Sequence, residues 1–177
     1  MWRLLSLFLW SLWVGIGFGI TFVAIPVVFG SDIRNSLPPG QAGRVAQSIL
    51  LRLFQWQVGI VALAATLHFL ERRRNPASAG RLHAWLLPPL GALSLVALFW
   101  LHPLLAGIHA ERYDIHTQEP RRRQLAAQFG VWHGISQVGN LLILLGTSAA
   151  WWNMAQRLRS DSHEIPVKKD PPKPVGL

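Results

Sequence analysis

The sequence predicts an all-α integral membrane protein in which four helices cross the bilayer as one bundle. Four apolar stretches, at about residues 4–29, 49–70, 82–105 and 129–152, each exceed the roughly 20 residues that a helix needs to span a membrane. Hydrophobic residues make up 51% of the 177 and charged residues only 14%, so these stretches lack the charged face of a soluble amphipathic helix.

The first stretch begins like a secretion signal, because Arg3 precedes an apolar run. The run is longer than the 15 residues or so of a signal's apolar region, so we expect it to remain as a span. Tryptophans near the ends of the bundle are expected to anchor it at the membrane interface; they are Trp2, Trp10, Trp13, Trp151 and Trp152.

The connections differ in character. Residues 31–40 form an outer loop, and residues 75–80 form a tight turn. Residues 108–128 are polar but have few helix breakers, so helices three and four are expected to extend beyond the bilayer. The predicted transmembrane domain covers residues 1–155, and a basic, proline-rich tail predicted to be disordered covers residues 156–177.

The distribution of cations predicts the orientation. Ten lie on one side, in the residues before the first span, in the second connection and in the tail, against six on the other side, with Arg52 inside a helix. Both termini are therefore expected in the cytoplasm, in a plasma or inner membrane. The net charge of +9 is expected to serve anionic lipid contact, because no nucleic-acid-binding module has room here. The absence of cysteine excludes thiolate metal sites and disulfides.

The second helix carries a stripe of small and polar residues that we expect to face the interior. Its members lie within about 40° of one line on the helix; they are Ser48, Arg52, Gln55, Gly59, Ala62 and Thr66. Arg52 costs roughly 2.5 to 3.5 kcal/mol inside a bilayer unless it pairs or reaches the surface. Two interpretations of Arg52 follow: its side chain reaches up to the outer membrane surface, or it has a functional role.

The fourth helix repeats the pattern within a wedge of about 60°, formed by His133, Ser136, Asn140 and Thr147. Hydrogen bonds from Ser136 and Asn140 across helices would contribute about 0.6 kcal/mol each. Two small-xxx-small pairs are expected to allow close helix packing; they are Gly15 with Gly19 and Gly130 with Gly134.

Several polar residues are predicted to meet at one depth near the outer surface. Arg52, His102 and His133 lie at the outer ends of three helices, and Pro26 frees the carbonyl of Phe22 on the first. We therefore expect His133 to contact Arg52 or His102, and these residues are the candidate binding site.

A family resemblance rests on four motifs. Pro26 to Phe29 closes the first helix, Ala42-Gly43 opens the next segment, Pro103 lies late in helix three, and His133 to Leu141 has the pattern His-Gly-x-Ser-x-x-x-Asn-Leu. The chain resembles the transmembrane protein 205-like membrane proteins over about residues 4–152. The resemblance implies a four-span bundle with both termini on one side and no established enzyme activity. Leu104 departs from the family, in which an arginine often follows the helix-three proline.

Three function classes follow. The first is a non-catalytic membrane protein that acts through a polar seam in a membrane complex, transport or resistance process, with a membrane-protein partner or a second copy. The second is a haem- or copper-binding protein with His102 and His133 as ligands. The third is a proton-linked transporter or enzyme, which the apolar stretches disfavour because they hold no carboxylate.

Overall fold

The computed structural model describes residues 2–74 and 81–163, and it confirms the predicted all-α fold class. No strand occurs in these residues. The helical elements, in chain order, are α1 (Trp2–Phe18), η1 (Gly19–Ala24), α2 (Ile25–Phe29), α3 (Ser31–Ser36), α4 (Gln41–Arg74), α5 (Arg81–Val96), η2 (Ala97–Leu101), α6 (His102–Arg112) and α7 (Glu119–His163). Four helical segments, Arg3–Phe29, Gln41–Arg74, Leu82–Arg112 and Glu119–Ser160, are long and apolar enough to cross a membrane, which indicates an integral membrane protein.

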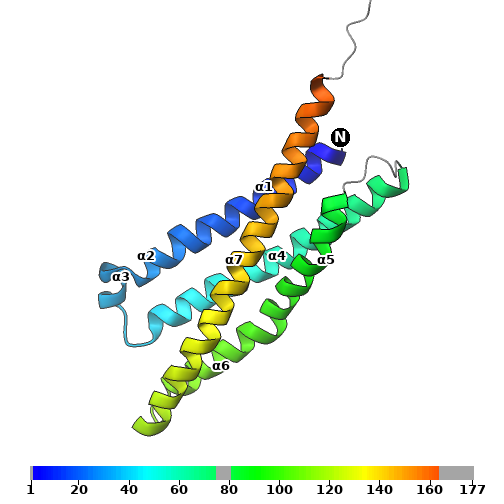
Figure 1. Ribbon diagram of the computed structural model, residues 1–177. Coiled ribbons are helices and arrows are strands. Elements are labelled where there is room, and N and C mark those ends of the chain that lie inside the picture. The colour runs from blue at the N-terminus through cyan, green and yellow to red at the C-terminus, as the bar shows by residue number, and fades with distance from the viewer. Residues whose placement is uncertain (1, 75–80, 164–177) are drawn as a thin grey trace, which may run out of the picture.

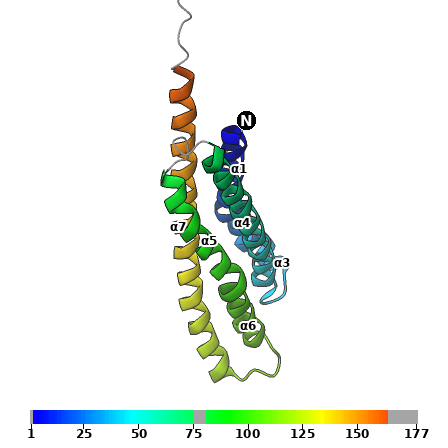
Figure 2. The ribbon, with the colours of Figure 1, turned by 90° about the vertical axis from the view of Figure 1, so that its right-hand side faces the viewer.

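The four segments pack side by side as a bundle. The α1 helix contacts α4 and α7, and the α5–α6 segment contacts the same two helices (Figures 1 and 2). The start of α1, the end of α4, the start of α5 and the end of α7 lie together; we call this the terminal end. The opposite end holds α3, the start of α4 and the turn between α6 and α7.

The helices extend beyond the apolar stretches that predicted them. The α4 helix begins eight residues before residue 49, and α7 begins at Glu119. Pro120 does not interrupt α7 because it lies in the first turn, where its missing N–H would have no partner in the helix. Helices α6 and α7 also continue past the apolar stretches, to Arg112 and from Glu119, and their extension beyond the bilayer stays a prediction. The α7 helix also continues through residues 156–163, which the sequence predicts to be disordered, because the first proline after it is Pro166. The predicted turn at 75–80 and the tail from 164 lie outside the described residues.

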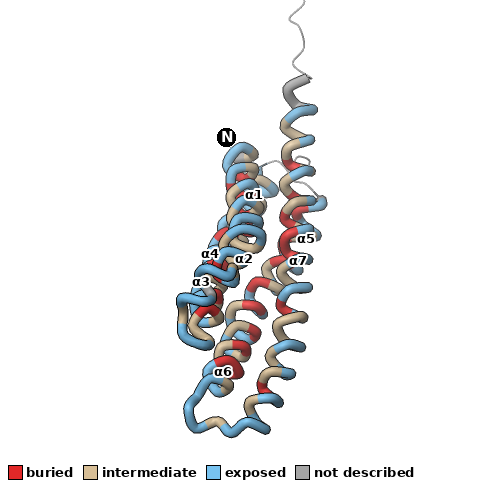
Figure 3. Tube along the Cα trace, turned by 90° about the vertical axis from the view of Figure 1, so that its left-hand side faces the viewer, coloured by how far each residue is buried: buried red, intermediate tan, exposed pale blue. Residues whose placement is uncertain are grey.

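Buried residues lie where the helices pack against each other (Figure 3). Many large apolar side chains are exposed on the outside of the bundle. Trp10 and Trp13 are each 1% exposed and their rings stack with centroids 5.5 Å apart. The expectation that they anchor the membrane interface is wrong, since helix packing places them in the core. Trp152, at 60% exposed, is accessible as an interfacial residue would be.

Two prolines follow widened helical turns. Pro26 comes two residues after the π-helical segment η1, and Pro103 comes two residues after η2. A proline lacks the backbone N–H and crowds the carbonyl four residues earlier, and a wider turn relieves that crowding. The predicted local disturbance at Pro26 is therefore a π turn, and Pro26 itself is exposed rather than part of a polar site.

The glycines that allow close packing are not the predicted ones. A Cβ atom added at Gly15, Gly19, Gly130 or Gly134 would meet nothing within 4 Å, so the predicted pairs do not mark tight helix contacts. Added Cβ atoms at Gly17, Gly91 and Gly146 would instead lie 3.1, 3.2 and 2.9 Å from Leu144, Val61 and Leu90. The four-residue spacing predicted a shared face but not whether that face meets another helix.

Candidate functional site: a polar cavity at the terminal end

The stripe on α4 faces outward, which contradicts the predicted inward seam on this helix. Ser48, Arg52, Gln55, Gly59, Ala62 and Thr66 are all exposed. Arg52 donates a hydrogen bond from Nη1 to Oε1 of Gln55 at 3.1 Å, within the same exposed face. The opposite face of α4, with Leu53, Gln57 and Ile60, packs into the bundle. Helical periodicity correctly predicted that the stripe residues share one face of α4. The opposite, mainly apolar face is the one that packs against the other helices.

The wedge on α7 does face the bundle. Thr147 is fully buried, and Ser136 is 9% exposed. Asn140 Nδ2 donates to Oγ1 of Thr21 at 2.9 Å, which links α7 to η1. The predicted cross-helix hydrogen bond is therefore present at Asn140, with Thr21 as its partner.

The two histidines proposed as metal or haem ligands have separate partners. His102 Nε2 donates to the backbone carbonyl of Gln47 at 3.1 Å, because a carbonyl oxygen can only accept. His133 Nε2 lies 3.1 Å from the side-chain Nε2 of Gln137, one turn later on α7. Within the described residues, no group of three or more His, Asp or Glu side chains could hold a metal ion. No hydrogen bond or ring contact found in that part of the chain joins His133 to His102 or Arg52.

A third histidine, which the sequence did not mark as important, connects several elements at the opposite end. His109 is 6% exposed, and its Nε2 donates to the carbonyl of Gly40 at 3.0 Å. Its ring lies against Tyr113 and Phe129, with centroids 4.8 and 5.8 Å away. An added Cβ at Gly43 would clash with this ring, so the glycine lets the imidazole approach the α4 backbone.

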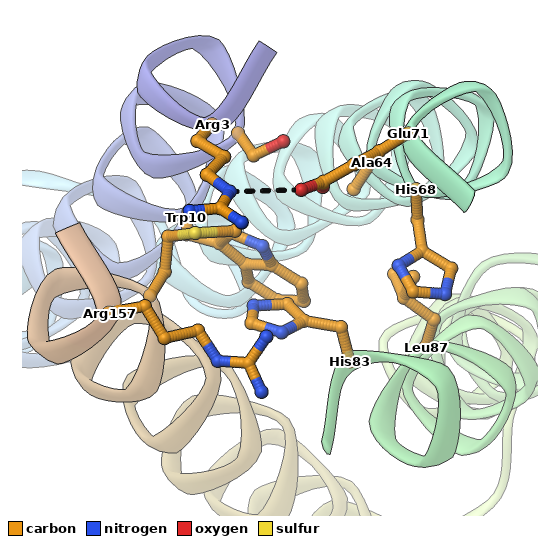
Figure 4. Close-up of a pocket in the computed structure, with 10 residues that line it drawn as sticks. Arg3, Trp10, Ala64, His68, Glu71, His83, Leu87 and Arg157 are labelled. Atoms are coloured by element: carbon orange, nitrogen blue, oxygen red, sulfur yellow. Dashed lines mark hydrogen bonds and ion pairs between the residues drawn. The ribbon is translucent and has the colours of Figure 1, made fainter. Parts of the chain in front are cut away.

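A small cavity lies at the terminal end, between all four membrane segments (Figure 4). It has room for about one water molecule. Its wall combines basic, acidic and imidazole groups with apolar side chains; the lining residues are Arg3, Ser6, Trp10, Ala64, His68, Glu71, His83, Leu87, Met154 and Arg157. Four segments distant in sequence thus supply one polar site.

An ion pair forms one side of this cavity. Arg3 Nε donates to Oε1 of Glu71 at 3.1 Å, and the two side chains are 30% and 12% exposed (Figure 4). Glu71 lies within the span-length helix α4, one residue beyond the apolar stretch that ended at Leu70. The apolar stretches themselves hold no carboxylate, as predicted, but the longer helix α4 carries one directly after its stretch.

Imidazole nitrogens without partners form the other side. His83 is 3% exposed, and neither of its ring nitrogens makes a hydrogen bond of good geometry, although the backbone of Ala150 on α7 approaches the ring. The Nε2 atom of His68 is also buried and unbonded. His83 extends from α5 toward Trp10, whose ring it meets edge-on at 5.6 Å, and toward Arg157 of α7 (Figure 4). Buried polar groups are almost always hydrogen-bonded, so these nitrogens mark a place where a ligand would be stabilised.

The sequence held signals for this cavity that the apolar stretches obscured. His68 and Glu71 are three residues apart on α4, which places them on the same face of the helix. Because they lie beside Arg72 to Arg74, which indicate the orientation of the helix in the membrane, they read as part of a polar helix end rather than as a site. His83, at the start of the next stretch, has no local pattern that indicates burial.

Comparison with known proteins identifies a family. Neither the curated proteins nor the solved structures contain a match to this chain. A family model described as "Domain of unknown function (DUF4149)" matches residues 8–114, which include α2 to α6 and most of α1. The match covers more than half of the chain, so the chain belongs to the DUF4149 family.

Proposed function

We propose that this chain is a non-catalytic membrane subunit that binds a partner membrane protein through the exposed stripe on α4. The observation that carries the proposal is the outward position of Arg52 among small and polar residues of a span-length helix. Small side chains such as Gly59 and Ala62 allow the backbone of a second helix to approach closely.

The cost of exposing Arg52 to lipid favours a partner. On insertion scales a charged residue costs roughly 2.5 to 3.5 kcal/mol at the centre of a membrane helix, and this is an upper bound for Arg52, which lies near the outer end of its apolar stretch. The hydrogen bond with Gln55 does not neutralise the charge. A partner acceptor would lower this cost, and the polar stripe would be removed from lipid in the same step.

The charge of Arg52 indicates a partner helix with a carboxylate rather than a second copy of this chain. Two copies in one membrane pair about an axis along the membrane normal, so the same stripe on both copies would bring the Arg52 side chains together. Like charges at that distance repel. A carboxylate at the same depth would pair with Arg52 instead.

Site-specific crosslinking tests this proposal. The chain has no cysteine, so Gln55→Cys introduces a single reactive thiol beside Arg52, and Leu141→Cys on α7, which is 50% exposed, is the matched control. A photoactivated thiol reagent in native membranes should give one protein adduct from position 55 and none from position 141.

The adduct must also depend on the charge. Adding Arg52→Gln to Gln55→Cys should reduce the yield at least fivefold, and the captured protein should carry Asp or Glu within a membrane helix. An adduct with a second copy, or a yield that Arg52→Gln leaves unchanged, would contradict the proposal.

The remaining assignments belong to the same proposal. The sequence has more arginine and lysine on the side predicted to hold both termini, which supports cytoplasmic termini in a plasma or inner membrane. A reporter fused to the C-terminus, active only in the cytoplasm, tests that orientation. The relation to transmembrane protein 205-like proteins also stays a proposal; its most specific string, at 133–141, lies outside the matched residues.

A further inference from the structure

We infer that the cavity at the terminal end binds the phosphate group of an anionic phospholipid. The site is built from four membrane segments and contains His83, a buried side chain whose two ring nitrogens have no partner. The inference is independent of the partner proposal, because the cavity and the exposed α4 stripe involve different residues.

The donors around the cavity match an anionic oxygen ligand. His83 supplies an imidazole N–H, and Arg3 and Arg157 supply guanidinium groups from α1 and α7 (Figure 4). Guanidinium groups bind phosphate through several N–H donors at once. Glu71 offsets one of the two positive charges, so the wall is left with an excess of one positive charge when the imidazoles are neutral.

The same charges disfavour a metal ion. Arg157 lies beside His83, so a cation bound at that imidazole would be repelled by the guanidinium (Figure 4). Met154 and two histidines line the cavity, and they are ligands that copper accepts. The described residues nevertheless offer no cluster of three His, Asp or Glu around one point.

The position of the cavity favours lipid as the source of the phosphate. Its charged residues lie at the ends of the membrane segments, where headgroups meet the protein, and three further arginines, Arg72 to Arg74, end α4 beside it. Basic pockets between transmembrane helices commonly bind anionic headgroups. The space holds about one water molecule, which suits one phosphate oxygen while the rest of the headgroup stays at the mouth.

Native mass spectrometry of the full chain in detergent tests this inference. The probes are phosphatidylglycerol, zwitterionic phosphatidylcholine and inorganic phosphate, each titrated separately. One phosphatidylglycerol should bind at least tenfold more tightly than phosphatidylcholine, because the choline cation opposes the arginines.

Two variants and one control assign the binding to the cavity. His83→Leu removes the imidazole donors at similar volume, and Arg157→Gln removes a guanidinium; each should weaken phosphatidylglycerol binding at least tenfold. Arg159→Gln changes an exposed arginine on the same helix and should alter binding less than twofold. If one variant fails to fold, the other still decides the result.

Three results would overturn the inference. Equal affinity for the two lipids, or binding that neither variant weakens, would mean ordinary contact of lipid with the protein surface. Inorganic phosphate that binds with the same residue dependence while phosphatidylglycerol does not would exclude lipid as the source. Copper(I) binding that His83→Leu abolishes, without lipid binding, would assign a metal site.

Discussion

The histidines at the two ends of the bundle differ in whether their ring nitrogens are hydrogen-bonded. At the opposite end, His102 and His109 each donate to a backbone carbonyl on the other side of a helix contact. At the terminal end, His83 makes no hydrogen bond of good geometry although it is more deeply buried than His109. A buried polar group without a partner costs about 1 to 3 kcal/mol, so it persists where something other than stability retains it. Burial alone therefore does not distinguish a structural histidine from a ligand-binding one, whereas its hydrogen bonds do.

The largest effect is expected at His109. His109→Leu would leave the Gly40 carbonyl without its donor and remove the ring contacts with Tyr113 and Phe129. The lost hydrogen bond and aromatic contacts should lower the free energy of unfolding by about 2 to 4 kcal/mol. Titration with a denaturing detergent, followed by circular dichroism, measures this value. A change below about 0.5 kcal/mol, within the range of ordinary surface substitutions, would mean that His109 is not structural.

A smaller effect is expected at the glycine beneath that ring. Gly43→Ala places a methyl group against the His109 imidazole, and such overpacking costs about 1 to 3 kcal/mol. Gly130→Ala is the matched control, because a methyl group there meets nothing and should stabilise the helix by up to about 1 kcal/mol. In a Gly43→Ala, His109→Ala double variant the two effects should be non-additive, because the crowded ring is gone. Equal effects at Gly43 and Gly130 would contradict the close approach.

The two polar stripes explain how far the sequence could predict the site. Both obey helical periodicity, yet the stripe with Asn140 faces the bundle and the stripe with Arg52 faces outward. Hydropathy predicts the number of helices because each span must satisfy its own backbone. It does not predict helix rotation, since lipid and the bundle interior are equally apolar. The cavity was missed for a related reason: His68, Glu71 and His83 lie at the ends of apolar stretches, and only tertiary packing brings them together.

The Asn140 bond tests the predicted seam on α7. Asn140→Leu removes its hydrogen bond to Thr21, and such bonds in membrane proteins contribute about 0.6 kcal/mol on average and at most about 1.7. The free energy of unfolding should fall by that amount. Val138→Leu, at a 60% exposed position of α7 with no polar side-chain atom, is the control and should change stability less. If the two substitutions have equal effects, the bond between α7 and η1 contributes no stability.

The smallest change in stability is expected at His83, the most buried of the histidines discussed above. Leucine fills a similar volume; it loses the edge-on contact with Trp10 but also removes two buried nitrogens without a well-formed hydrogen bond, and these effects offset each other. His83→Leu should therefore change the free energy of unfolding by less than about 0.5 kcal/mol or stabilise the fold. The same detergent titration measures it beside His109→Leu. Because both histidines are almost fully buried, loss of packing alone would predict similar costs for the two substitutions. A cost at His83 as large as that at His109 would show that His83 is structural after all. A neutral His83→Leu that also loses phosphatidylglycerol binding would separate stability from ligand binding at a single side chain, and would assign the unpaired imidazole to the ligand.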